Sequence, residues 1–371
     1  MKNGFQIVVL VFAFLASATA CDTPVFRYAL EKWAAGDYRA FVFFEDKPEP
    51  EEEEALSLFQ QCLGNITFEQ VNVAELDAGF NAELYEFKGP KREYRKSKEQ
   101  VEAEKKRASA RRLFHHKRTM YNAFAAGKPL PCAVVMPPLP SGTKQGSPRS
   151  DFALWEGGVT PAEVASLLDS PARVEIAKRI LAGDSAVWVM IPCGDPLKDD
   201  ACLARLTDIL KKAEETVVLS VPVEKHKISG GVPLKLAFSI VMVDLDDPDE
   251  SFFVKNLLRL RGMRRGMPGR SVSSSSVLPP DVSADSPAII PFIGRGRAIE
   301  LVEIENINEE YIIDLCRYIS GPCSCEIKQQ NPGMDMLFSV DWKSGLVPMI
   351  GADEGPGALR GLGALLMEDA P

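Results

Sequence analysis

The strongest constraint on the fold is an order of secondary-structure elements that occurs twice along the 371-residue chain. The first copy starts with the β-rich run "YRAFVFF", continues with a helix and a second strand, and closes with two strands and a helix opened by a capping box at Thr160. The second copy repeats this order from "SAVWVMI" at Ser185 to a helix capped by Asn308. This order predicts an α/β protein with mixed sheets flanked by helices.

Both copies resemble the thioredoxin fold. Its lead strand, helix and second strand correspond to "YRAFVFF…LSLFQQCL…ITFEQVNV" and to "SAVWVMI…ACLARLTDIL…LAFSIVMVDL". Pro131 and Pro287 stand where that fold carries a proline before its third strand. The resemblance implies two tandem thioredoxin-like domains, and two unrelated α/β units are the alternative.

The resulting division of the chain has four parts. We expect a signal peptide at 1–20, a first domain at 21–182 with a basic helical insert at 88–124, a second domain at 183–330 with a flexible loop at 262–286, and a C-terminal tail at 331–371. The loop is predicted to be flexible because it is rich in Gly, Ser, Pro and Arg. The end of the tail is rich in Gly and Ala, which predicts weak packing.

The first twenty residues predict export. Lys2 precedes an apolar run from Ile7 to Leu15, and Ala18-Thr19-Ala20 has the small-x-small form of a cleavage site. The run is shorter than the roughly 20 apolar residues of a membrane-spanning helix. We therefore expect the mature protein to act outside the cytoplasm.

Cys21 directly follows this cleavage site. The stretch from Ala18 to Cys21 resembles the lipobox of bacterial lipoproteins, although that motif prefers Leu where Ala18 stands. The resemblance implies that Cys21 is lipidated and holds the protein at a membrane. Two alternatives are a thiol activated by the helix that opens at Thr23-Pro24, and a plain thiol beside the cleavage site.

Three further stretches resemble a family of exported bacterial proteins. They are "CDTPVFRYALEKW", "LLDSPARVEIAKRILAGDSAVWV" and "GPCSCEIKQQNPGMDML". The resemblance implies a periplasmic or membrane-anchored protein of the cell envelope. It implies no particular chemistry.

The cysteines do not form the usual redox motif. A thioredoxin-like oxidoreductase needs Cys-x-x-Cys after the lead strand, where the helix N-terminus stabilises a thiolate. The first copy has "EDKPEPEEEE" at this place, and the second has Cys193 followed by Cys202 nine residues later. We interpret these two cysteines as buried or structural, with a redox or disulfide role as the alternative.

Cys323 and Cys325 are the closest cysteine pair in the sequence. A disulfide is the simplest interpretation in an oxidising compartment. The alternative is a Cu(I) site that adds Cys316 and the nearby methionines, because soft sulfur ligands suit that ion. Cys316 also falls on the apolar face of its predicted helix, which favours a place in the core.

The charge of the chain is unevenly distributed. The segment Lys88–Arg118 holds 13 Lys and Arg against 4 Glu, a local charge of +9, so the rest must carry −18 to give the net −9. A basic helical segment can attach to an anionic membrane or an acidic partner, and the predicted export argues against nucleic acid. The alternative is a solvated helical protrusion.

No catalytic or cofactor motif stands out in this chain. The "GRGRA" stretch places Arg295 and Arg297 between glycines, which predicts either an anion clamp or a tight turn. We expect no cofactor. The leading hypothesis is a non-catalytic binding or assembly protein with a protein partner in the envelope. The alternative is a thiol-disulfide or copper-handling protein that uses Cys193, Cys323 and Cys325.

Overall fold

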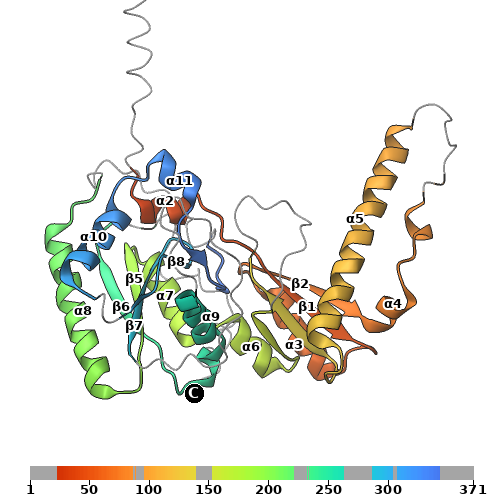
Figure 1. Ribbon diagram of the computed structural model, residues 1–371, viewed down its shortest axis with the longest axis horizontal. Helices are drawn as coiled ribbons and strands as arrows, with labels where there is room; N and C mark the ends of the chain where they lie inside the picture. The colour runs from red at the N-terminus through yellow and green to blue at the C-terminus, as the bar shows by residue number, and fades with distance from the viewer. Residues whose placement is uncertain are drawn as a thin grey trace, which may run out of the picture.

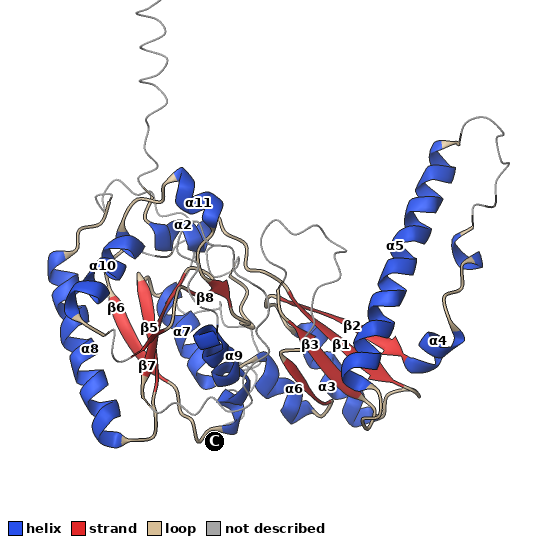
Figure 2. Ribbon diagram, in the orientation of Figure 1, coloured by secondary structure: helices blue, strands red, loops and turns tan. Residues whose placement is uncertain are grey.

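The computed structural model describes residues 23–86, 88, 96–138, 153–220, 232, 234–262, 286–303 and 307–342 of the chain. These residues form two lobes, each built around a mixed β-sheet with helices on both faces (Figures 1 and 2). The predicted mixed α/β class is therefore confirmed. The leader, Cys21 and nearly all of the 262–286 loop lie outside the described residues.

The first lobe contains a four-stranded sheet in the order β2-β1-β3-β4. Its strands are β1 (Tyr38–Phe44), β2 (Ile66–Asn72), β3 (Cys132–Met136) and β4 (Trp155–Gly158). β1 and β2 are parallel, whereas β3 runs antiparallel to both β1 and β4. The central strands β1 and β3 are covered on both faces, which explains their nearly continuous apolar runs. A cis peptide bond joins Leu130 to Pro131, directly before β3.

Helices cover both faces of this first sheet. They are α3 (Pro50–Gln61), α4 (Val73–Ala78), a 3-10 turn (Glu83–Tyr85), α5 (Lys98–Met120) with a π-helical turn (Tyr121–Ala125), and α6 (Pro161–Leu168). α3 and α6 pack together on one face, and α4 and the C-terminal end of α5 pack on the other. The N-terminal end of α5 projects away from the lobe (Figure 1).

The second lobe repeats the strand order of the first. Its strands are β5 (Ala186–Ile191), β6 (Phe238–Met242), β7 (Ala288–Ile293), β8 (Arg297–Ala298), β9 (Val302–Glu303) and β10 (Met334–Asp335). The order is β10-β8-β7-β5-β6, with β5 parallel to β6 and antiparallel to β7. β8 and β9 each pair antiparallel with β7, so the last strand predicted for the second copy is divided into two short strands.

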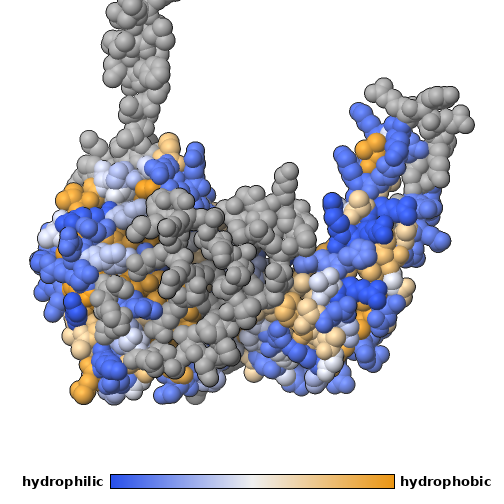
Figure 3. Space-filling model, viewed as in Figure 1, coloured by the Kyte–Doolittle hydropathy of each residue, from blue (hydrophilic) through white to orange (hydrophobic). Residues whose placement is uncertain are grey.

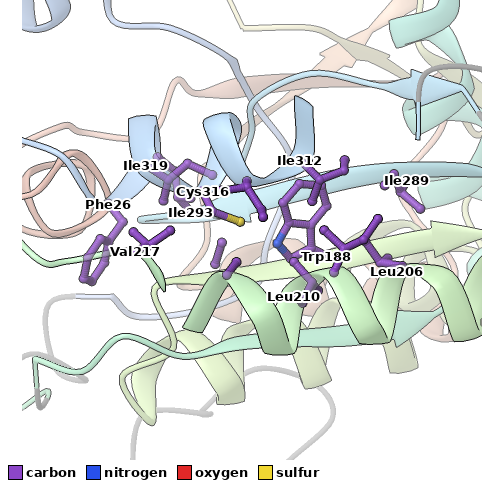
Figure 4. Packing of buried hydrophobic residues seen from close by; sticks show 14 of the residues in the cluster. Phe26, Trp188, Leu206, Leu210, Val217, Ile289, Ile293, Ile312, Cys316 and Ile319 are labelled. Atoms are coloured by element: carbon purple, nitrogen blue, oxygen red, sulfur yellow. The ribbon is translucent and has the colours of Figure 1, made fainter. Parts of the chain in front are cut away.

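Helices also cover both faces of the second sheet. They are α2 (Val25–Glu31), α7 (Pro171–Leu181), α8 (Pro196–Thr216), a 3-10 turn (Pro248–Glu250), α9 (Ser251–Gly262), α10 (Glu309–Ser320) and α11 (Cys325–Gln330). On one face the fully buried Trp188 lies between α8, which supplies Leu206 and Leu210, and α10, which supplies Ile312 (Figure 4). α7 and α9 pack on the opposite face.

The structure places two helices differently from the sequence-based division, which put 21–182 in the first domain. Apolar residues of α2, such as Phe26, pack in the core around Trp188, and those of α7, such as Ile176, pack on the other face of the same sheet. Backbone hydrogen bonds reinforce the position of α2, because the N–H of Val25 donates to Gly321 O at 3.0 Å. Both helices therefore belong to the second lobe.

The segment that follows β10 joins the two lobes instead of forming the start of a tail. Met336 and Phe338 are fully buried. Asn65 of the first lobe donates to Met336 O and accepts from the N–H of Phe338, both at 3.0 Å. Gly64 permits this contact, because a Cβ at its position would stand 2.0 Å from Phe338 O. Residues 343–371 lie outside the described residues.

Candidate functional site

The turn between β5 and α8 is where the sequence predicts a reactive cysteine. Cys193 lies in this turn and is half-buried. The backbone N–H groups of Cys193 and Gly194 donate to the two carboxylate oxygens of Asp199 at 2.8 and 3.0 Å. Asp195 caps α8 by accepting from the N–H of Leu197 at 3.1 Å. Carboxylates thus occupy N–H groups that would otherwise be available to an anion at this helix start.

Cys202 lies further along α8, inside the core of the second lobe. Its side chain is 2% exposed. Burial, followed by the charges of Asp199 and Cys193, raises the pKa of Cys202 to about 11. Because the thiolate is the nucleophile, Cys202 is unreactive near neutral pH. Cys193 is nevertheless near enough to contribute to the raised pKa of Cys202, although their sequence spacing is wider than that of a usual dithiol.

The corresponding turn of the first lobe, between β1 and α3, is rich in carboxylates. Glu49 and Glu52 form a capping box at the start of α3, in which the N–H of Glu49 donates to Glu52 Oε2 at 2.7 Å. Pro50 occupies the first helical position. This turn holds no thiol, and its negative side chains suit the positive end of the helix dipole.

The remaining candidate cysteines have different surroundings. Cys316 is fully buried on α10, where burial and then the charge of Glu214 raise its pKa to about 12. Cys323 is buried, and its N–H donates to Thr23 O at 2.9 Å. Cys325 is an exposed thiol at the first position of α11. In the part of the chain that the structure describes, no three His, Cys, Asp or Glu side chains are placed to hold a metal ion.

Arg295 and Arg297 both bind the protein itself. Arg295 donates to Leu30 O at 2.8 Å and to Glu31 O at 3.3 Å, which satisfies carbonyl groups at the C-terminal end of α2. Arg297 forms an ion pair with Asp335 at 2.7 Å and lies over the ring of Trp33. These contacts give the "GRGRA" turn a structural role in holding α2 and β10 on the second sheet.

α5 carries most of the basic residues that the sequence analysis singled out. It begins at a capping box formed by Ser97 and Gln100 and runs for 23 residues. Hydrophilic residues predominate on its projecting end in the view of Figure 3. Lys117, near its C-terminal end, pairs with Glu69 of β2 at 2.6 Å. Neither α5 nor any other helix among the described residues is long and apolar enough to span a membrane.

A cavity of about 280 Å³ lies beside β3 and β4. Its walls include Phe124, Pro129, Pro131, Cys132, Val134 and Gly158. Lys128 and Glu156 also line it, and their charged groups pair with each other. The cavity is thus lined mostly by apolar surface, with one ion pair among its polar groups.

The decisive residue missed by sequence reasoning is Asp199. An acidic residue in the first turn of α8 was a visible signal for an interaction with the helix N-terminus, but nothing in the spacing showed that it reaches back to Cys193. In comparisons with known proteins, no family model, curated protein or solved structure matches this chain. The resemblance to exported bacterial proteins therefore stays a prediction, and function is argued from the geometry.

Proposed function

We propose that the protein is an exported, non-catalytic binding or assembly protein of the cell envelope. It is built from two thioredoxin-like units and tethered at a membrane through lipidated Cys21. Its partner in the envelope is a protein. The support comes from the arrangement of the two sheets, from the contents of the two turns after their lead strands, and from the leader sequence.

The case for two thioredoxin-like units rests on strand order. In each sheet the lead strand pairs in parallel with the second strand and antiparallel with the third, and the third pairs antiparallel with the fourth. In each lobe the helix after the lead strand and the last helix of the unit lie on the same face. Agreement of order, direction and helix placement in both halves supports a duplicated fold.

The observation that carries a non-catalytic function is the use of carboxylates at both turns. Asp199 accepts hydrogen bonds from the N–H groups of Cys193 and Gly194, and Glu52 accepts one from Glu49. A thioredoxin-like catalyst uses this helix start to stabilise a thiolate. With a carboxylate already there, a second negative charge is disfavoured.

The alternative function, thiol-disulfide exchange or copper handling, has one observation in its favour. Cys193 and Cys202 lie near enough for their charges to interact. A pair of this kind can be assayed directly, and the assay separates the two hypotheses.

The test combines intact mass with a disulfide-reductase assay on protein exported with its own leader. We expect a mature chain that starts at Cys21 and carries a diacylglyceryl group, and no turnover of a disulfide substrate. Cys193→Ser and the double variant Cys323→Ser/Cys325→Ser should behave like the wild type. Turnover or Cu(I) binding that is lost in these variants would reject the proposal in favour of the alternative.

A further inference from the structure

Three exposed basic residues line one side of α5. Lys98, Lys105 and Arg112 are seven residues apart, which places them on one side of a helix over a length of about 21 Å. The opposite side packs on the segment after α4, where the ring of Phe114 lies 5.8 Å from that of Phe80. Beyond Arg112 the stripe's own side turns onto the sheet, where Met120 is buried. All three basic side chains are exposed. We call these three residues the basic stripe.

The charges of the basic stripe are available for an external partner. Among the described residues, no ion pair or hydrogen bond engages the ammonium groups of Lys98 and Lys105, and Arg112 donates only to Ser109 Oγ on its own helix. Val101 lies on the same side of the helix between the first two stripe residues and is 38% exposed. A basic surface with an exposed apolar side chain fits the boundary between water and phospholipid headgroups.

The position of α2 shows which side of the protein would face a membrane. α2 lies at the upper edge of the second lobe in Figure 1, and the N-terminal end of α5 rises on the same side of the molecule. Thr23 is fixed to the second lobe by its hydrogen bond from Cys323. Only Asp22 separates Thr23 from Cys21, a reach of about 7 Å, so a lipid on Cys21 would hold this side close to the membrane.

We infer that the basic stripe of α5 is a second membrane contact that binds anionic phospholipid headgroups. The side of the protein that faces the membrane is inferred from the proposed lipidation of Cys21. Charge complementarity supports a lipid surface, because the segment Lys88–Arg118 carries +9 on a chain whose other residues carry −18. An anionic surface attracts this segment and repels the rest, which orients the protein. The two acyl chains of a diacylglyceryl group anchor the protein stably, and the basic surface then orients it at the membrane.

The test uses the full mature chain with Cys21→Ser, so that no lipid contributes. Its binding to vesicles of phosphatidylcholine with 30% phosphatidylglycerol is measured by co-sedimentation at 50 and 300 mM salt. The stripe variant is Lys105→Glu/Arg112→Glu. The matched control is Arg205→Glu/Lys211→Glu, which makes the same charge change at two exposed positions of α8.

We expect salt-sensitive binding of the parent chain to the anionic vesicles and none to pure phosphatidylcholine. The stripe variant should bind at least about 10-fold more weakly, and the control within about 2-fold of the parent. Equal weakening by both variants, or no binding of the parent at 50 mM salt, would overturn the inference. Binding of soluble polyglutamate without vesicle binding would overturn it in favour of an acidic protein. None of these results depends on lipidation, which the intact mass tests separately.

Discussion

The turns after β1 and β5 occupy the same place in their sheets and differ in one respect. Both helices start with proline at the first position, Pro50 or Pro196, and in both a carboxylate from the first turn binds back to the preceding backbone. Only the second turn contains a cysteine. In both turns the carboxylate accepts hydrogen bonds from backbone N–H groups at the start of a helix. The first turn does this without a cysteine, so the cysteine is not needed for this structural role.

The two lobes differ more in how their cores are closed. The first lobe covers its sheet mainly with helices from its own stretch of chain, and only Phe252 of α9 and Leu337 join its buried core from the second half. The second lobe also recruits α2 from the N-terminal side, α7 from between the two sheets, and the residues after β10. The same strand order is thus completed in two ways, and the second way ties distant parts of the chain together.

Substitution of Arg173 tests whether the contacts between the two lobes make them unfold as one unit. Its guanidinium is fully buried and donates to Leu167 O at 2.9 Å and, across the junction, to Leu337 O at 3.4 Å. Arg173→Met would leave these carbonyls unsatisfied and remove the counter-charge of Asp169 and Glu250. We expect the free energy of unfolding in urea to fall by about 3–5 kcal/mol in a single transition.

The control for this prediction is Arg317→Met. Arg317 is 58% exposed and pairs only with Asp314 on its own helix, so the loss should be about 0.5 kcal/mol or less. Two separate transitions, of which only one responds to Arg173→Met, would show that the lobes are independent halves. The comparison between the lobes would then concern two domains and not one coupled structure.

The pH dependence of stability tests the burial of Cys202 beside the second turn. Its pKa is about 11 in the folded protein, against 9.0 for an ordinary thiol. Below pH 9 the thiol is protonated in both states, and as the pH rises towards 11 only the unfolded state ionises. Folding stability should therefore fall by about 2 kcal/mol between pH 8 and 10.5, relative to Cys202→Ala measured in the same buffers.

Other groups titrate in this range, so the result depends on the difference between the two proteins. Cys325→Ala serves as the control, because its side chain is exposed and its removal should leave the wild-type pH dependence unchanged. If Cys202→Ala keeps the full wild-type slope, the thiol is ionised or solvated in the folded state. Cys202 would then return to consideration as a partner of Cys193.

The sequence predicted the helices and strands of this protein better than it predicted which of them pack together. Capping residues such as Thr160 and Asn308 marked helix starts that the structure contains, because a cap acts within one turn. The assignment of α2 to the first domain was wrong, because α2 packs on the second sheet. Its apolar face could cover either sheet, and the sequence does not show which one it covers. Residues after β10 were predicted to form a tail, but the structure bonds them to Asn65 of the first lobe. The sequence carries no local signal for hydrogen bonds between positions more than 270 residues apart.

At the candidate site, too, local features were predicted from the sequence and long-range contacts were not. Burial of Cys316 was visible in its helical spacing, and its fully buried position agrees with this. The anion clamp expected as one interpretation of Arg295 and Arg297 depended on where their donors point, which the sequence does not encode locally. In the structure both arginines donate to backbone or side-chain groups of the second lobe.

The smallest expected effect compares the two turns directly. Asp199→Ala removes an acceptor from two backbone N–H groups, and Glu52→Ala removes an acceptor from one. We expect losses of about 1–2 kcal/mol for Asp199→Ala and about 0.5–1 kcal/mol for Glu52→Ala in urea unfolding at pH 7. Asp199→Ala should also lower the pKa of Cys202, because the charge of Asp199 is its second cause of elevation after burial.

The isosteric variants Asp199→Asn and Glu52→Gln complete this test. Glu52→Gln keeps a carbonyl oxygen that can accept from the N–H of Glu49, and Asp199→Asn keeps one for a single N–H of the two that Asp199 binds. Both variants remove the negative charge near the helix start. If the asparagine variant retains most of the stability and still lowers the pKa of Cys202, hydrogen bonding holds the turn and charge suppresses the thiolate. Faster alkylation of Cys193 in Asp199→Asn than in the wild type would show that this carboxylate keeps a competent site inactive, whereas an unchanged rate would make the cysteine incidental to the turn.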